Sequence, residues 1–191
     1  MNTKDKFYLW YDLTRDKLIK KYKHDYILMG GLIASTSPRF QVKRNINTSK
    51  ILYNDYIKNK QGFFDYAVNN KKQFIKKYKL LPAHYNNILR VLLKDIKQDK
   101  NPIILGGLKV NSFYNNIIYK DDNFVTIDIW MLRFFKHEKL HVTIKEYKRY
   151  TRIIKKYAKK QNLKPKQAQA QIWKKQINSV GRTAQFLHDK I

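Results

Sequence analysis

Apolar side chains recur at three- and four-residue intervals along most of this chain, which is the spacing of one face of an α-helix. A clear example is the segment 82–97, where Ile88, Val91, Leu92 and Ile96 share one face. We find no convincing pair of strand patterns, no internal repeat and no low-complexity linker. The sequence therefore predicts an all-α protein.

The segment 25–35 is almost wholly apolar and is followed by Ser37-Pro38. A proline keeps the residue before it out of helical geometry, so we expect a buried helix that ends near this point. Gly30 and Gly31 within the segment would allow another helix to pack closely against it.

Other helix boundaries also carry local signals. Thr143 with Glu146 three residues later predicts a capping box, and Pro165 suits the first turn of a last helix. The apolar segment 125–135 fits either a short strand or a buried helix. Besides the buried helix at 25–35, the predicted helices cover residues 18–26, 40–56, 63–78, 82–97, 110–118, 144–160 and 165–177.

The charge balance points to a polyanionic partner. Lys and Arg number 41 against 14 Asp and Glu, which gives a formal net charge of +27. With 43% apolar residues the chain has enough material for a core, which excludes a disordered basic tail. A surface so basic repels itself unless a polyanion neutralises it. Double-stranded DNA is the expected partner, and an anionic membrane surface or an acidic protein are the alternatives.

Several classes of protein are excluded by what the sequence lacks. The chain has no cysteine, so it has no disulfides, thiolate metal sites or cysteine-ligated iron–sulfur cluster. The uncharged run from Tyr26 to Pro38 is shorter than the roughly 20 residues that span a bilayer, and it is a poor signal peptide. We therefore expect a cytoplasmic protein, located in the host cytoplasm or nucleoid if a phage encodes it. The length suits one compact domain or two small lobes.

A glycine turn, residues 105–109, lies between two predicted helices and reads Leu-Gly-Gly-Leu-Lys. Gly106 and Gly107 would let the backbone approach a phosphate, and the helix that follows presents unpaired N–H groups there. The alternative is a simple helix–helix connection that needs a positive φ angle. Lys109 follows the turn directly.

Asp128 is unusual because it lies inside an otherwise apolar run, residues 125–132. An ionised carboxylate in such surroundings costs several kcal/mol unless it has a partner. It is therefore either a structural group, as a helix cap or in an ion pair with Arg133 or a lysine, or a catalytic one.

These two motifs resemble those of the helix-hairpin-helix DNA glycosylases of the endonuclease III type. In that family a hairpin close to Leu-Pro-Gly-Val-Gly-x-Lys precedes a Val-Asp-x-His-x-x-Arg motif by about eighteen or nineteen residues. Residues 104–109 resemble the first motif, residues 127–133 resemble the second, and Lys109 and Asp128 are 19 positions apart. Residues 32–42 are similar to the buried helix of the family and the segment after it. Residues 147–173 resemble small phage-encoded proteins that look like remote members.

The resemblance implies a two-lobed all-α fold without an iron–sulfur cluster, formed by residues 1–191 as one unit. Its core motifs lie in residues 26–135, and helices in 143–180 complete the second lobe. The implied function is a DNA glycosylase, with or without AP-lyase activity, that cleaves the N-glycosidic bond of a flipped modified or damaged base. Lys109 would be the nucleophile, and Asp128 would stabilise charge and transfer protons. No cofactor or metal is implied, and we expect a monomer.

Further residues are assigned to DNA or to the base. Thr36 falls where a glutamine that fills the base stack often lies, and Trp130 replaces the common histidine. Trp130 and Tyr114 are aromatic residues that could stack on a flipped base, although both are also natural core residues. The residues expected to contact DNA are Gly106, Gly107, Arg39, Lys43, Arg44 and Arg133.

Two alternative functions stay open. One is a DNA-binding module that keeps the fold and has lost the chemistry, and the other is an enzyme that exchanges or hypermodifies a flipped base with the same Lys and Asp. His137 and His141 have a spacing found in metal sites, but Lys139 and the loop before Thr143 favour a surface pair.

Overall fold

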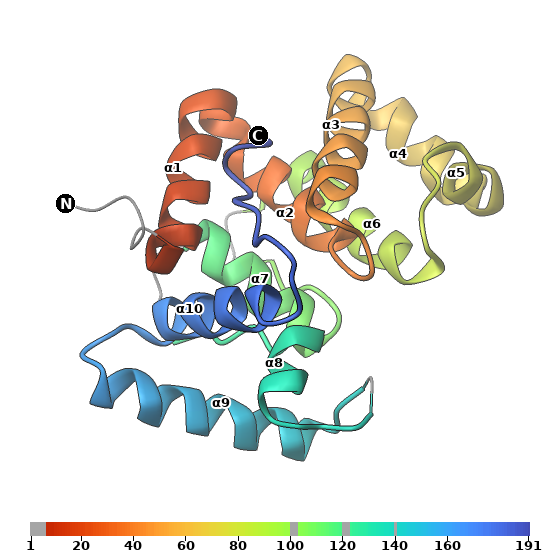
Figure 1. Cartoon of the computed structure of the whole chain (residues 1–191). Helices are drawn as coiled ribbons and strands as arrows, with labels where there is room; N and C mark the ends of the chain where they lie inside the picture. Colours follow the sequence, from red (N-terminus) through yellow and green to blue (C-terminus); the bar gives the residue numbers. More distant parts are fainter. Residues whose placement is uncertain (1–6, 100–102, 120–122, 140) are drawn as a thin grey trace.

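The computed structural model describes residues 7–99, 103–119, 123–139 and 141–191. In these ranges the protein is built from helices, and none of these residues lies in a strand (Figure 1), which confirms the all-α prediction. No helix in the described ranges combines the length and apolar character that are needed to cross a bilayer. The elements are α1 (Trp10–Tyr22), the 3-10 helix η2 (Lys23–Asp25), α2 (Tyr26–Thr36), α3 (Val42–Lys58), α4 (Lys60–Asn69), α5 (Lys71–Lys77), α6 (Pro82–Ile96), α7 (Leu108–Ile118), α8 (Ile129–Phe134), α9 (Ile144–Lys160) and α10 (Pro165–Asn178).

Helix α2 is the central element and contacts α1, α3, α6 and α7 (Figure 1). All residues from Leu28 to Thr36 are buried. A Cβ atom on Gly30 would lie 2.2 Å from Ile118 Cδ1 of α7, and one on Gly31 would lie 2.9 Å from Val91 Cγ1 of α6. The two glycines therefore allow both helices to approach α2 closely, as the sequence predicts.

The predicted helix 63–78 is two helices, α4 and α5. Asn70 separates them with φ −124° and ψ 45°, which is outside helical geometry. On one continuous helix Phe63 and Phe74 would lie about 16 Å apart along the axis. The break brings their ring centroids to 5.5 Å, so both rings pack into the same core.

A second, smaller core is formed by side chains of α8, α9, α10 and the segment before α8, and these helices lie together in Figure 1. The apolar segment 125–135 serves this core first as backbone without regular secondary structure, up to Asp128, and then as the short helix α8, and not as one strand or one helix. Trp173 of α10 packs against both cores. The buried residues of the smaller core are Val125, Ile127, Met131, Leu132, Tyr147, Ile154, Ala158, Ala168 and Ile172.

The boundaries of α9 and α10 follow their capping signals. Glu146 Oε2 accepts the N–H of Thr143 at 2.7 Å, and Thr143 Oγ1 accepts the N–H of Glu146 at 3.2 Å, so the predicted capping box is confirmed. Pro165 occupies the first turn of α10, also as predicted.

After α10, residues 179–191 pass back to the side of the larger core (Figure 1). Leu187 is 2% exposed in that core. The carbonyl of Gln185 accepts from Trp10 Nε1 at 3.1 Å, and the carbonyl of Lys190 accepts from Lys50 Nζ at 2.9 Å. The C-terminal segment is thereby fixed against α1 and α3.

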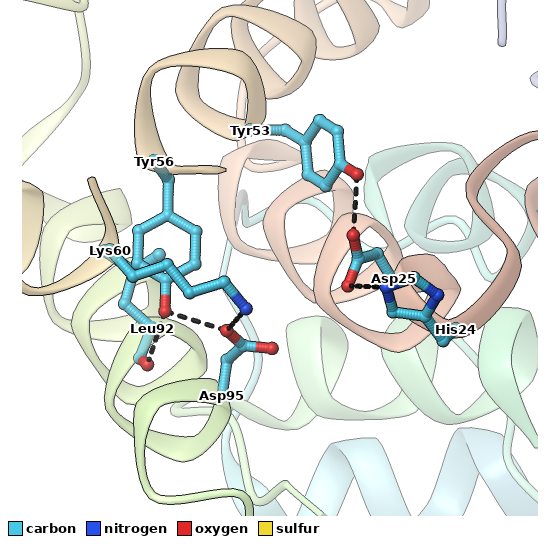
Figure 2. Close-up of polar contacts among 7 residues, drawn as sticks. All are labelled: His24, Asp25, Tyr53, Tyr56, Lys60, Leu92 and Asp95. Atoms are coloured by element: carbon cyan, nitrogen blue, oxygen red, sulfur yellow. Dashed lines mark hydrogen bonds and ion pairs between the residues drawn. The ribbon is translucent and has the colours of Figure 1, made fainter. Parts of the chain in front are cut away.

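Several of the few carboxylates serve as internal hydrogen-bond acceptors. Figure 2 shows Tyr53 of α3 donating to Asp25 at 2.8 Å, and Tyr56 and Lys60 donating to Asp95 at 2.9 and 2.7 Å. Burial and the neighbouring carboxylate raise the pKa of Tyr53 to about 12. Carboxylates used in this way tie α3 to η2 and α6, and they leave much of the basic surface without neutralising partners.

Candidate functional site

The glycine turn leads into α7, and the side chain of Asn87 makes two hydrogen bonds to it. Gly106 N–H donates to Asn87 Oδ1 at 2.6 Å, and Asn87 Nδ2 donates to the carbonyl of Gly106 at 3.1 Å. Gly107 precedes α7 with φ +86°, a conformation that favours glycine. No side chain caps α7, so the N–H groups of its first turn are available to an anion.

Lys109 lies in the first turn of α7 and lines a cavity of about 620 Å³. Phe113, one helical turn further, lines the same cavity, whereas Val110 and Tyr114 are buried on another face of the helix. The register of α7 therefore directs the lysine to the cavity and not to the core.

Asp128 begins α8 and lines the cavity with Lys109. Its Oδ1 atom accepts the N–H groups of Trp130 and Met131, both at 3.0 Å, which makes it the N-cap of the helix. Its Oδ2 atom accepts Nε1–H of Trp173 at 2.9 Å. The helix-cap role that the sequence suggested for Asp128 is thus present, and the charge of the same carboxylate also acts on Lys109.

The surroundings shift the pKa values of Lys109 and Asp128 in opposite directions. Burial lowers the pKa of Lys109, although the charge of Asp128 opposes this. Burial raises the pKa of Asp128, while Lys109, the two backbone N–H groups and Trp173 act against the rise. The site therefore favours a neutral amine more than a solvent-exposed lysine would allow. Such opposed shifts are typical of catalytic sites.

Aromatic rings form much of the cavity wall. They come from segments far apart in the chain: Trp10, Tyr11, Phe40, Phe113, Trp130 and Trp173. Polar groups lie among them, because Tyr11 donates to Gln169 Oε1 at 2.6 Å and both residues line the cavity. A wall of this kind can stack on a planar ring and hydrogen-bond to its edge.

The structure brings together some of the residues expected from sequence. Arg39 and Trp130 line the cavity with Lys109 and Asp128, and the guanidinium of Arg133 lies 4.4 Å from the Trp130 ring centroid. Arg39, Lys109, Asp128 and Trp130, which come from the α2–α3 loop, α7 and the start of α8, therefore surround one space, and Arg133 contacts it only through the Trp130 ring.

Thr36 and Tyr114 do not line this cavity. Thr36 is fully buried, and its hydroxyl contacts the carbonyl of Leu32 and the hydroxyl of Ser49, each at 2.9 Å. Tyr114 is fully buried in the larger core beside Tyr119. Their assignment to the base or the base stack stays a sequence prediction that this geometry does not favour.

Lys43 and Arg44 line a second hollow, of about 460 Å³, between α3 and the end of α5. Lys77 and Lys79 also line it, and Arg44 donates to the carbonyl of Lys79 at 3.0 Å. Gln41 lines both hollows, so the basic hollow lies directly beside the cavity.

Sequence reasoning missed Asn87, Tyr11, Gln169, Trp173 and Arg182. Gln169 and Trp173 are one helical turn apart on α10, which was a signal that they share a face. Nothing local indicated which surface that face would meet.

His137 contacts Tyr150 and the carbonyl of His141, at 2.9 and 3.1 Å, and not the ring of His141. In the described part of the chain no three His, Asp or Glu side chains gather as ligands of a metal ion.

Comparison with known proteins places the chain in a family. The model of the family of unknown function DUF7178 matches residues 5–178. No curated protein and no solved structure matches the chain.

Proposed function

The chain belongs to the family of unknown function DUF7178, and we propose that it is a DNA glycosylase that flips a modified or damaged base into the cavity shared by Lys109 and Asp128. The observation that carries this proposal is that a lysine and an aspartate 19 positions apart, both in unusual surroundings, line one aromatic-walled cavity. The specific two-lobed helix-hairpin-helix fold is part of the same proposal.

The arrangement supports DNA as the partner in three ways. The net charge is +27, and several carboxylates are engaged inside the molecule. The first turn of α7 offers uncapped N–H groups at the glycine turn. Lys43 and Arg44 lie in a basic hollow beside the cavity. A duplex laid across these features would meet cations on both sides of the flipped nucleotide.

The cavity suits a base that has left the stack. A base inside a duplex is out of reach of an enzyme, so it must be extruded at a cost of a few kcal/mol. Stacking on the partly exposed aromatic rings of the cavity wall, Trp130 and Phe113, would offset part of this cost. The pair Tyr11–Gln169 offers hydrogen bonds to the edge of the base.

The chemistry follows from the two shifted groups. The neutral amine of Lys109 attacks C1′ of the sugar while the C1′–N bond breaks, and the electron pair of that bond leaves with the base, which takes up a proton. Asp128 stabilises the positive charge that develops on the sugar. It also accepts the proton that the Lys109 nitrogen loses after it has bonded to C1′. The lone pair of the Lys109 nitrogen then forms the C1′=N double bond while the C1′–O4′ bond breaks, and O4′ takes up the proton held by Asp128, which gives a Schiff base.

Borohydride trapping tests this proposal directly. The protein is incubated with duplexes that each carry one damaged or modified base, and reduction converts the Schiff base into a stable covalent complex. We expect trapping with at least one duplex and loss of trapping in Lys109→Gln. Lys43→Gln is the matched control, because it also removes one cation expected to face DNA but leaves the cavity intact.

The outcomes separate the candidate functions. Base release without trapping would indicate a glycosylase that uses water and not Lys109 as its nucleophile. DNA binding with neither base release nor trapping across a broad panel would favour the non-catalytic module. Trapping that survives Lys109→Gln would show that another lysine is the nucleophile.

A further inference from the structure

The two carboxylate oxygens of Asp128 have different tasks. Oδ1 accepts two backbone N–H groups, from Trp130 and Met131, and this builds the start of α8. Oδ2 accepts one side-chain donor, Nε1–H of Trp173, at 2.9 Å. Because Oδ1 is occupied by the helix, Oδ2 is the oxygen that remains for chemistry in the cavity.

Packing fixes the direction of the Trp173 indole. Its ring stacks on Phe7 with centroids 5.7 Å apart and planes 23° apart, and it meets Trp10 at 5.9 Å. Trp173 also packs against both hydrophobic cores and lines the cavity. The indole N–H is a donor only, so it can hold an acceptor but cannot take a proton from one.

We propose that Trp173 is a positioning residue, whose indole N–H holds Oδ2 of Asp128 in the cavity and favours the ionised carboxylate beside Lys109. Any effect of Trp173 on base release rests on the proposed function, whereas the effect of Trp173 on the Asp128 carboxylate does not. Trp173 comes from α10, 45 residues beyond Asp128, and neither residue type nor spacing in the sequence marks the contact.

The Trp173 N–H matters because it stabilises the charged form of Asp128 in a buried place. Burial favours the protonated form of Asp128 and so raises its pKa, and a donor such as Trp173 favours the charged form. Burial also raises the pKa of Tyr11 and Tyr147, which keeps both phenols neutral near pH 7. Lys109 is then the other group in the cavity whose pKa is shifted toward neutral pH. The titratable and charged groups that act on Asp128 or line its cavity are Lys109, Tyr11, Tyr147, Arg39 and Arg182.

The first test measures the carboxylate and needs no enzymatic activity. The ¹³C resonance of the Asp128 side-chain carboxyl, assigned by its loss in Asp128→Asn, is titrated in the wild type, Trp173→Phe and Trp10→Phe. We expect its midpoint to move to higher pH in Trp173→Phe. Trp10→Phe is the matched control: it removes an indole N–H from the same aromatic cluster, but that N–H donates to the carbonyl of Gln185. An equal midpoint in the two variants, or no shift in either, would overturn the proposal.

A second measurement uses the unmutated tryptophan, in case Trp173→Phe does not fold. The indole N–H resonance of Trp173 should titrate with the same midpoint as the Asp128 carboxyl in wild-type protein. An indole resonance that does not respond to pH, or that keeps the same response in Asp128→Asn, would contradict the proposed hydrogen bond.

Kinetics then connect this hydrogen bond to the reaction. We expect Trp173→Phe to move the acidic limb of the kcat/KM profile to higher pH and to lower kcat by up to about a hundredfold, with KM little changed. A loss of kcat without movement of the acidic limb would indicate a merely structural role. If wild-type protein releases no base from any duplex while the carboxyl midpoint still moves in Trp173→Phe, the proposed function fails and the action of Trp173 on Asp128 stands.

Discussion

Asn87 holds the backbone of Gly106 from both sides, accepting from its N–H at 2.6 Å and donating to its carbonyl at 3.1 Å. The side chain is 5% exposed, and it reaches from α6 to the turn that precedes Lys109. The Asn87 amide thus holds Gly106, while Asn111 Oδ1 accepts the N–H of Leu105 in the same turn, which the proposed function places against a phosphate.

Removal of this amide should loosen the turn. We expect Asn87→Ala to lower the free energy of unfolding by about 1–3 kcal/mol, because half-buried Gly106 loses two hydrogen bonds. Affinity for duplex DNA should fall as well. Chemical denaturation and a binding titration measure the two effects. Asn86→Ala is the matched control, since Asn86 is the exposed neighbour on α6. Equal stability and equal DNA affinity of the two variants would show that the hydrogen bonds of Asn87 to Gly106 contribute to neither.

The dependence of stability on pH should reveal the opposed pKa shifts of Lys109 and Asp128. The folded-state pKa of Lys109 lies below its ordinary value of 10.5. In the window between the two values the unfolded chain binds more protons, so this lysine makes the wild type more stable as pH rises. Lys109→Met lacks that contribution. The free energy of unfolding of Lys109→Met minus that of the wild type should therefore decrease with rising pH.

Asp128 should give the opposite slope. Its folded-state pKa lies above the ordinary 3.8, so between these values the folded protein binds more protons and loses stability as pH rises. The free energy of unfolding of Asp128→Asn minus that of the wild type should increase with pH. Denaturation series at several pH values measure both differences, and slopes of the same sign would contradict the opposed shifts.

The helices could largely be predicted from the sequence because their signals are local. The face shared by Ile88 and Val91, and the capping pair Thr143 and Glu146, each act within a few residues. The break at Asn70 could not be predicted. It has neither proline nor glycine beside it, and it exists because Phe63 and Phe74 share one core.

The candidate site could be predicted only in part, for the same physical reason. Lys109 and Asp128 stand out singly, by a glycine turn and by an apolar run, and they do line one cavity. Tyr114 lies in the core, and its position one helical turn after Val110 already indicated a buried face. Trp173 meets Asp128 through the packing of α10 on α8, which no local pattern encodes.

Salt dependence should distinguish the basic hollow from other basic surfaces. Binding to duplex DNA releases counterions, so log affinity should fall with log salt by about 0.9 for each phosphate that the protein neutralises. We expect the double variant Lys43→Gln, Lys79→Gln to lower this slope by about 0.9 for each phosphate that it leaves without a cation. The control is Lys155→Gln, Lys156→Gln on the exposed face of α9, which removes the same charge. Equal slopes in the two double variants would show that the hollow does not bind DNA specifically.

Lys109 and Asp128 should act in one step, and a double variant tests this. Asp128→Asn keeps the shape and an acceptor for the helix cap but removes the charge that balances the developing sugar cation, so base release should fall by about 10²-fold or more. Lys109→Gln should suppress the same step by removing the nucleophile. Groups that act together are not additive, so the double variant should be little slower than the slower single variant. Single-turnover base release measures all four proteins, and losses that multiply in the double variant would show that the two residues act independently.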